Sequence, residues 1–151
     1  MKFVIQCVKN ASVTVDGNVT GSIGHGFLVL CGISGTDTRE IADKMVKKLC
    51  ALRIFKDENG KTNLSLMDIK GELLIVSQFT LYADCKSGNR PGFSNAGSPE
   101  MAEEMYNYVL KKAGECVPDV QKGIFGAYMQ VSLLNDGPFT IVLDSKELFE
   151  K

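Results

Sequence analysis

The sequence has few of the side chains that usually perform acid–base chemistry in enzymes. Its single histidine, His25, stands between two glycines, a setting typical of an exposed turn. A Ser-His-Asp or Cys-His mechanism would need this residue as its base. Metal sites need several His or Cys ligands at short spacing, and the five cysteines stand far apart. Glycine-rich phosphate-binding signatures are absent too, so we expect neither a metal nor another cofactor.

Polar residues inside "ELLIVSQFTLYA" (72–83) are the first candidates for a site. This segment is the strongest strand prediction in the sequence. Alternation would place Ser77 and Phe79 on one face and Gln78 and Thr80 on the other. Two interpretations stay open: a half-exposed strand that turns its polar residues to water, and a strand end whose backbone groups and hydroxyls line a pocket.

The segment "DCKSGNRPGFSNAGSP" (84–99) predicts a long loop, of a length that often carries function. Within it, Arg90 and Phe93 belong either to a surface turn or to a substrate-gripping loop. Lysines on the predicted helices usually form solvated faces. Together with Lys86, Arg90 and Lys122 they could instead hold a phosphate backbone.

The segment "NDGPFT" (135–140) lies between two strand-like runs, "MQVSLL" and "IVLDS". Asp136-Gly137 is typical of a tight hairpin turn. Pro138 is harder to explain, because proline cannot donate a hydrogen bond to the strand that it opens. A simple hairpin turn therefore does not explain why proline stands at position 138.

The remaining pattern predicts the elements that must position these residues. We expect strands at both ends, a buried central strand and two amphipathic helices, the first capped by Thr36 or Asp37 and the second ended by Gly114. The expected segments are strands at 2–8, 11–15 and 27–33, a helix within 36–55, a strand at 72–83, a helix from Pro99, and a hairpin at 125–145. This order predicts an α+β fold with mixed, largely antiparallel, barrel-like β-sheets and two covering helices, in a single domain spanning 1–151.

Composition narrows the function classes further. The chain has 151 residues and a formal net charge of -1, which excludes a generally basic surface for wrapping duplex nucleic acid. The N-terminus lacks the apolar region of a signal peptide, and the odd set of unpaired cysteines fits a reducing compartment. We therefore expect a cytoplasmic protein.

Taken together, these segments resemble the D-aminoacyl-tRNA deacylase family, also called D-tyrosyl-tRNA deacylases. The resemblance runs nearly end to end through "ASVTVDG", "LRIF", "DENGK", "SQFTLYAD", "GNRPGF", "FGA" and "NDGPFT". Two of these blocks are family signatures: the S-Q-x-x-L segment, here Ser77, Gln78 and Leu81, and the Gly-Pro motif, here Gly137-Pro138.

The resemblance implies an esterase that proofreads chirality in translation. It would hydrolyse D-aminoacyl-tRNA, and also glycine mischarged on alanine tRNA, with the aminoacyl-tRNA 3' end as its partner and no membrane involved. It also implies a homodimer in which Gly137-Pro138, joined by a cis peptide bond, enters the active site of the other subunit. The two carbonyl groups would there exclude an L-side chain.

The resemblance also implies roles for the candidate residues. Main-chain groups of Phe79 and Thr80 would hold the amino acid and stabilise the oxyanion, so these are the expected catalytic residues. Ser77, Gln78, Gly137 and Pro138 would bind the substrate and shape the pocket. The Thr80 hydroxyl as a nucleophile ranks second, because no base lies beside it in the sequence.

Two positions depart from the family pattern. Cys7 stands where an arginine is expected to brace the Gly-Pro turn, and Tyr128 stands where an acidic residue is expected. Two alternatives therefore stay open: a relaxed-chirality deacylase acting on mischarged L-aminoacyl-tRNA, and a noncatalytic module that binds the tRNA end.

Overall fold

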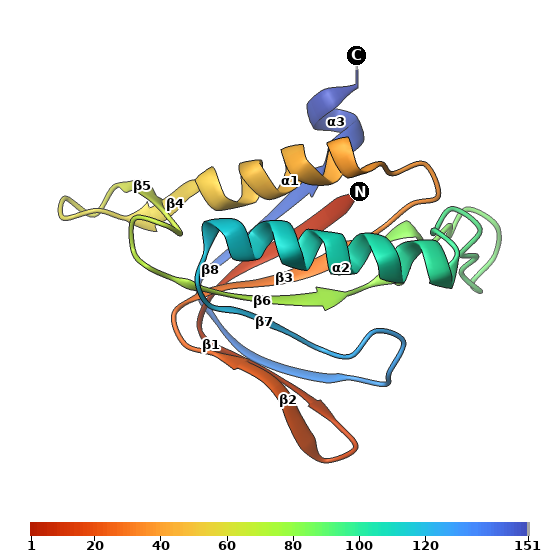
Figure 1. The fold of residues 1–151 in the computed structure, drawn as a ribbon, viewed down its shortest axis with the longest axis horizontal. Coiled ribbons are helices and arrows are strands. Elements are labelled where there is room, and N and C mark those ends of the chain that lie inside the picture. Colours follow the sequence, from red (N-terminus) through yellow and green to blue (C-terminus); the bar gives the residue numbers. More distant parts are fainter. Residues whose placement is uncertain (151) are drawn as a thin grey trace.

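The structure, a computed structural model, describes residues 1–150 (Figure 1). Strands and helices follow one another as a β-rich start, a helical middle and a β-rich end. The strands are β1 (Lys2–Val15), β2 (Asn18–Ile23), β3 (Gly26–Gly32), β4 (Arg53–Lys56), β5 (Thr62–Ser65), β6 (Glu72–Ser77), β7 (Val120–Lys122) and β8 (Gln130–Asp144). The helices are α1 (Arg39–Ala51), α2 (Pro99–Cys116), α3 (Ser145–Phe149) and the 3₁₀ helix η1 (Phe79–Tyr82).

One mixed sheet carries most of the fold, in the order β2-β1-β3-β6-β7, with β8 also paired to β1. The central strand β3 is antiparallel to β1 and parallel to β6. The sheet curls until β2 approaches β7, where a Cβ on Gly21 would lie 2.4 Å from the carbonyl oxygen of Lys122. Glycine therefore permits the close approach that nearly closes the barrel.

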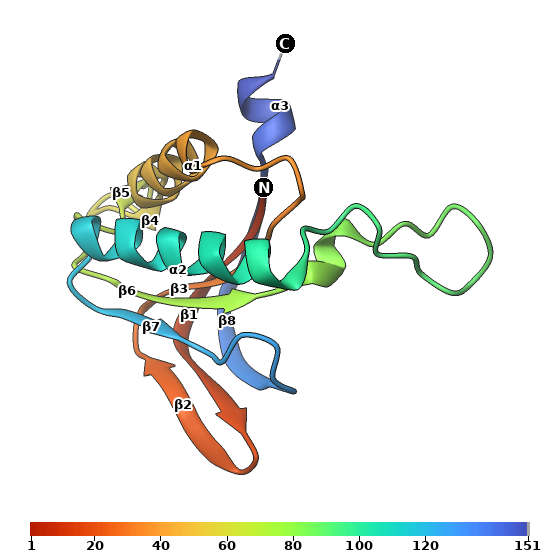
Figure 2. The same ribbon diagram turned by 45° about the vertical axis from the view of Figure 1, so that its right-hand side comes forward.

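The helices α1 and α2 lie side by side over one face of this sheet, while α3 stands at the end of β8 (Figures 1 and 2). The predicted α+β class with barrel-like sheets and two covering helices is confirmed, and α3 is an additional short helix. One core cluster fills the space between helices and sheet, with Phe3, Phe27 and Leu49 fully buried. A second cluster inside the curled sheet contains Val8, Leu28 and Leu74.

The predicted central strand at 27–33 is confirmed, since β3 is buried on both faces. Asp16 and Gly17 connect β1 to β2, with positive φ values of 49° and 79° that suit a tight hairpin turn. The two strands predicted at 2–8 and 11–15 form one continuous strand, β1.

Both helix boundaries differ from the prediction. The N-cap of α1 is Thr38, whose hydroxyl accepts a hydrogen bond from the Ile41 amide at 3.3 Å, so the predicted caps Thr36 and Asp37 are wrong. The helix also stops at Ala51, and the next residues form β4. At the other helix, Gly114 does not end α2, which runs on to Cys116, because glycine weakens a helix interior by only about 1 kcal/mol.

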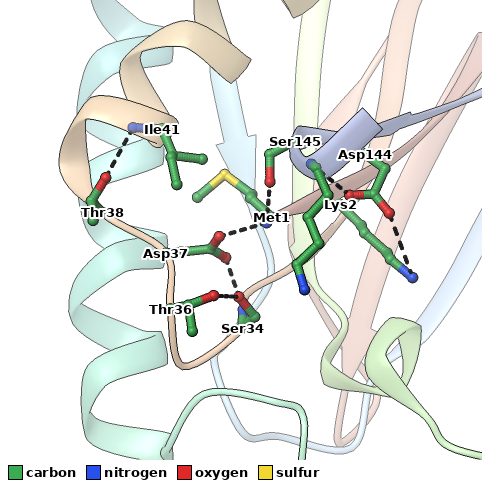
Figure 3. Close-up of polar contacts among 10 residues, drawn as sticks. Met1, Lys2, Ser34, Thr36, Asp37, Thr38, Ile41, Asp144 and Ser145 are labelled. Atoms are coloured by element: carbon green, nitrogen blue, oxygen red, sulfur yellow. Dashed lines mark hydrogen bonds and ion pairs between the residues drawn. The ribbon is translucent and has the colours of Figure 1, made fainter. Parts of the chain in front are cut away.

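The connection between β3 and α1 is tied to the chain start by a buried polar cluster (Figure 3). The α-ammonium group of Met1 lies 2.6 Å from Asp37 Oδ1 and donates to Ser145 Oγ at 2.8 Å. The other carboxylate oxygen of Asp37 accepts from the Ser34 amide at 2.8 Å. Asp37 thus joins the start of β1, the β3–α1 connection and the start of α3, which explains why it is not a helix cap.

Candidate functional site

A cavity of about 530 Å³ opens at the carboxyl ends of the parallel strands β3 and β6. Its walls come from four separate segments of the chain. The first is the end of β3 (Cys31, Ile33), and the second is the end of β6 with the turn that follows it (Val76, Ser77, Gln78, Phe79). The third is the loop before α2 with the first turn of α2 (Phe93, Ala96, Gly97, Pro99, Ala102). The fourth leads into the start of β8 (Phe125, Gly126, Ala127, Tyr128, Met129, Val131).

The strand predicted over 72–83 ends earlier than expected, and this creates the polar wall of the cavity. The Gln78 amide donates to the Cys31 carbonyl at 2.8 Å, and the chain then turns into η1, with Leu81 donating to the Gln78 carbonyl at 3.3 Å. The prediction that Ser77 and Phe79 alternate with Gln78 and Thr80 is therefore wrong, because the polar residues mark the strand end.

The three consecutive residues Ser77, Gln78 and Phe79 line the cavity, but Thr80 does not. The Gln78 side-chain amide hydrogen-bonds to the Thr80 hydroxyl, and Thr80 is exposed. The structure thus brings three of the predicted site residues together and leaves the Thr80 hydroxyl occupied outside the wall.

Backbone hydrogen bonds fix the opposite wall. The Gly97 amide donates to the Ile33 carbonyl at 2.9 Å, and Ser34 forms a β-bridge with Ala96. Because Ser34 also donates to Asp37, the buried cluster at the chain start supports this wall. Ser98 caps α2, with its hydroxyl accepting from the Met101 amide at 3.4 Å.

Aromatic side chains are prominent among the cavity-lining residues. The rings of Phe79 and Phe93 meet edge to face with centroids 5.0 Å apart. The Tyr128 side chain, at a position where the resemblance led us to expect an acidic residue, is 87% exposed. Of the predicted loop residues, Phe93 lines the cavity and Arg90 does not.

No Asp, Glu, Lys, Arg or His is among the cavity-lining residues within the described range 1–150. Burial, followed by the Asp37 carboxylate, raises the pKa of the Cys31 thiol to about 12, so this thiol stays protonated and is a poor nucleophile. His25 lies exposed in the β2–β3 turn, with its ring 5.1 Å from that of Phe55. In residues 1–150, no group of three His, Cys, Asp or Glu could hold a metal ion.

The predicted hairpin around "NDGPFT" is wrong, because both flanking segments pair with the same strand. Within β8, Asn135 pairs with Val8 and Thr140 pairs with Gln6. The four residues between them form a bulge opposite Cys7, which we call the Gly-Pro bulge (Asp136–Phe139). A hairpin signal here marks an insertion in one long strand.

Local bonds hold the Gly-Pro bulge in shape. Asn135 Oδ1 accepts from the Phe139 amide at 3.0 Å, and Asn135 Nδ2 donates to Thr140 Oγ1 at 3.0 Å. Gly137 has φ 141°, and a Cβ there would lie 2.9 Å from the Phe139 amide nitrogen, so the position favours glycine. The Gly137-Pro138 peptide bond is cis.

The Gly-Pro bulge does not line the cavity of its own chain, although both Gly137 and Pro138 are exposed. Cys7 lies beneath it and is buried. Burial and then the charge of Asp136 raise the pKa of this thiol to about 11. A neutral thiol therefore occupies the position where an arginine was expected.

Sequence reasoning missed most of the apolar wall, including Ala102, Phe125, Met129 and Val131. These residues follow ordinary core patterns, and only the topology brings them together. The structure shows why the neighbouring Gly123 is small, because a Cβ there would lie 2.5 Å from the Met129 sulfur. Separately, no helix within residues 1–150 has the length and apolar character that crossing a membrane requires.

The comparisons with known proteins agree with one another on the family. The model of the family described as D-Tyr-tRNA(Tyr) deacylase matches residues 4–144. The chain is 54% identical over 149 residues to the D-aminoacyl-tRNA deacylase of Clostridioides difficile (strain 630), covering 99% of this chain and 100% of that protein. It is 52% identical to the D-aminoacyl-tRNA deacylase of Thermosipho africanus (strain TCF52B), with the same coverage.

Solved structures show the same fold. One, described as a c-Myc DNA unwinding element binding protein, has 46% sequence identity and a TM-score of 0.91, covering 95% of this chain and 98% of that one. Another, described as a probable eukaryotic D-amino acid tRNA deacylase, superposes with a TM-score of 0.84 at 16% identity, covering 94% and 97%. With a family match over nearly its whole length, the chain belongs to the D-Tyr-tRNA(Tyr) deacylase family.

Proposed function

We propose that this protein hydrolyses the ester bond between a D-amino acid and the 3' end of tRNA, as a proofreading step in translation. The observation that carries the proposal is the family match over residues 4–144 together with relatives named D-aminoacyl-tRNA deacylase at above 50% identity. The same reaction on glycine mischarged to alanine tRNA follows, because glycine has no side chain for the site to reject.

The chemistry of the cavity supports a mechanism without a side-chain base. An aminoacyl ester is an activated acyl group, so attack by water needs mainly a pocket that stabilises the oxyanion. Removing one oxyanion-hole donor typically costs about 10²- to 10³-fold in rate. The tRNA's own 2'-hydroxyl would orient the water, and this requires no carboxylate, amine or imidazole in the walls, in keeping with the lining residues within the range 1–150.

The proposed catalytic groups are the main-chain amides of Phe79, which lines the cavity, and of Thr80, the next residue of η1, whose side chain lies outside the wall. They are the first amides of η1, and amides at the start of a helix have no acceptor within it. They are therefore available to a bound carbonyl oxygen. Ser77 and Gln78 would hold the amino acid and keep η1 in place, since the Gln78 amide is itself bonded to the Cys31 carbonyl.

Selection for D-amino acids requires a wall where an L-side chain would lie, and we propose that the Gly-Pro bulge of a second subunit supplies it. Two observations support a homodimer. The strand β8 pairs only with β1 within residues 1–150. It exposes Leu134 and Val142, at 52% and 61%, and an apolar edge of this kind is usually covered. The exposed bulge on the same strand could then reach the partner's cavity.

A direct test compares one tRNA carrying D-tyrosine with the same tRNA carrying L-tyrosine. At equal enzyme concentration we expect rapid loss of the D-ester and survival of the L-ester. The release of the labelled amino acid measures both rates. Equal rates on the two esters would support the relaxed-chirality deacylase. Tight binding of the tRNA with both esters intact would support the noncatalytic module, the class suggested by the neighbour that is described as a DNA unwinding element binding protein.

A cytoplasmic location is part of the same proposal. The five cysteines are free in the structure, which suits a reducing compartment where translation takes place. Fractionation of cells expressing the protein should recover it with tRNA synthetases rather than with membranes.

A further inference from the structure

The 3₁₀ helix η1 carries the two amides proposed for catalysis, but it cannot hold its own position. None of its residues, Phe79–Tyr82, is buried. Its backbone bonds are local, such as the one from the Leu81 amide to the Gln78 carbonyl at 3.3 Å. A single turn of helix is unstable in water without packing against the rest of a protein. Contacts with the sheet must therefore fix where η1 lies.

The residue before η1 is tied to the central strand. In the parallel pair of β3 and β6, Cys31 pairs with Ser77. The next amide along the chain, that of Gln78, donates to the Cys31 carbonyl at 2.8 Å. The start of η1 is therefore bonded to a strand that is buried on both faces, one residue before Phe79.

The next residue of β3, Gly32, receives the side chain of Leu81. A Cβ on Gly32 would lie 2.9 Å from Leu81 Cβ and 3.2 Å from Leu81 Cδ1. Real Cβ atoms essentially never have a neighbour closer than 3.0 Å, so glycine permits η1 to lie against β3. Leu81 belongs to the S-Q-x-x-L signature, and the mechanism proposed above gives its side chain no role.

The last residue of η1 contacts the neighbouring strand. Lys2 of β1 pairs with Gly32 on one side and with Asp144 of β8 on the other. Residues directly opposite in antiparallel strands have their side chains on the same face of the sheet. The Lys2 ammonium group lies 5.0 Å from the centre of the Tyr82 ring and 3.8 Å from an Asp144 carboxylate oxygen. This row of residues therefore gives η1 a second contact with the sheet.

We propose that four positioning residues hold η1 against the sheet and thereby fix the direction of its two catalytic amides. We call this set the η1 anchor (Lys2, Gly32, Leu81 and Tyr82). None of the four is among the cavity-lining residues in the range 1–150, so they act through η1 and not on the substrate. The inference rests on the proposed function, because it takes these amides to stabilise the oxyanion.

The two amides lie between fixed points. Phe79 and Thr80 follow the bond made by Gln78 and precede the contacts made by Leu81 and Tyr82. A shift of either amide would therefore disturb a contact on one side or the other. A misplacement of about 1 Å in an active site costs about 10²-fold in rate, so the anchor should affect kcat strongly.

The main test is Gly32→Ala. Gly32 lies in β3 and has no positive φ, so alanine acts there through its Cβ, which must move Leu81 and η1 with it. We expect kcat on D-tyrosyl-tRNA to fall by about tenfold or more, with KM changed by less than about twofold. The matched control is Gly114→Ala in α2, where a Cβ meets no atom within 4 Å and both constants should stay the same.

A second measurement needs no substrate. The backbone-amide NMR signals of Phe79 and Thr80 report the position of η1 directly. We expect both signals to shift in Gly32→Ala and to keep their wild-type values in Gly114→Ala.

A double variant separates positioning from a general loss of stability. Leu81→Gly removes the two atoms that the new Cβ would approach most closely. Adding Gly32→Ala to Leu81→Gly should therefore change kcat by less than about twofold, because residues that act through one contact have non-additive effects. Fold-changes that simply multiply in the double variant would overturn the contact between Gly32 and Leu81 as the cause.

Lys2→Met tests the other end of η1 with a substitution at a partly exposed side chain. Losing the cation over the Tyr82 ring should lower kcat by about two- to fivefold and shift the Thr80 amide signal. Asp144→Asn is its control, because it removes the ion pair with Lys2 and leaves the cation over the ring. We expect wild-type kinetics and signals for Asp144→Asn.

Failure of the anchor and failure of the proposed function give different results. If the wild type leaves D-tyrosyl-tRNA intact, the proposed function is wrong, and the amide signals alone then decide the anchor. Unshifted Phe79 and Thr80 signals in both Gly32→Ala and Lys2→Met would overturn the anchor, whatever the activity.

Discussion

At the scale of single residues, the candidate site is notable for the absence of acidic and basic side chains from its lining within residues 1–150. Ser77, Gln78 and Phe79 form a wall beside a cavity with no carboxylate, amine or imidazole among its lining residues in the range 1–150. The Thr80 hydroxyl is bonded to the Gln78 side chain. In the mechanism that we propose, hydrolysis at this site therefore relies on backbone groups and on the substrate.

Replacing Thr80 by alanine tests this reasoning. Thr80→Ala keeps the backbone amide and removes only the hydroxyl, so we expect the hydrolysis of D-tyrosyl-tRNA to fall by less than about fivefold, whereas loss of a true nucleophile typically costs about 10³-fold or more. Single-turnover rates measure the difference. His25→Ala serves as a control that should leave the rate unchanged, and a fall of Thr80→Ala to background would restore the hydroxyl as nucleophile.

Pro138 tests the proposed wall. If the Gly-Pro bulge rejects L-side chains by steric exclusion, Pro138→Ala makes it mobile and should lower the ratio of D to L hydrolysis by about tenfold or more, while the D rate changes little. The ratio is measured on one tRNA charged with either enantiomer. Ser132→Ala, at another position of the same strand, is the matched control. An unchanged ratio in Pro138→Ala counts against the wall.

At the scale of elements, the position of the cavity depends on where strands stop. The periodicity of the sequence predicts β3, the two helices and the start of β6 correctly, because these follow regular burial. The periodicity misses the end of β6, because polar residues after an apolar run fit both a continuing strand and a strand end. It also misses the path of β8, because an Asn-Asp-Gly-Pro segment fits both a hairpin turn and a bulge. Only long-range pairing, with β3 and with β1, decides between them.

The connection between β3 and α1 offers a prediction about stability. Asp37 pairs with the buried α-ammonium group, so Asp37→Asn leaves that charge without a partner and should cost about 3 kcal/mol. The thermal midpoint of the untagged protein should then fall by roughly 6–12 °C. Glu40→Gln removes an exposed ion pair with Lys44 in the same helix and should change it little. Equal midpoints for Asp37→Asn and the wild type would show that the pair is not stabilising.

The β4–β5 hairpin offers a prediction about pH. Hydrogen bonds to the Asp57 carboxylate lower its pKa, first from the backbone amide of Lys61 and then from the backbone amide of Asn59 and the side-chain amide of Asn63. The native state therefore binds the Asp57 proton less readily than the unfolded chain does. The ionised Asp57 carboxylate therefore stabilises the native state fully above the pKa of the unfolded chain, about 4. This stabilisation is lost as the pH falls through the lower pKa of the native state.

Unfolding midpoints at neutral pH and at about pH 3 measure this effect. Asp57→Asn should lose less stability between the two pH values than the wild type, whereas Glu58→Gln should behave as the wild type does. The same pH dependence in Asp57→Asn and the wild type would remove Asp57 as its source.

At the scale of the whole molecule, the cavity and the Gly-Pro bulge do not meet within residues 1–150 of one chain, and we propose that they are two halves of one site. The bulge lies on β8, opposite Cys7, and the cavity lies at the ends of β3 and β6. Sequence motifs identified residues of both the cavity and the bulge but could not predict where the two lie relative to each other. That arrangement depends on the curl of the sheet and, in our proposal, on a second subunit.

Mixing two defective variants shows whether one active site is built from two subunits. Ala96→Trp fills the cavity but keeps a normal Gly-Pro bulge, and Pro138→Ala keeps the cavity but has a defective bulge. After the two variants are unfolded together and refolded, we predict that D-selective hydrolysis reappears, because a mixed dimer joins the intact cavity of one subunit to the intact bulge of the other. A D-to-L ratio in the mixture that stays equal to that of Pro138→Ala alone would contradict the shared site.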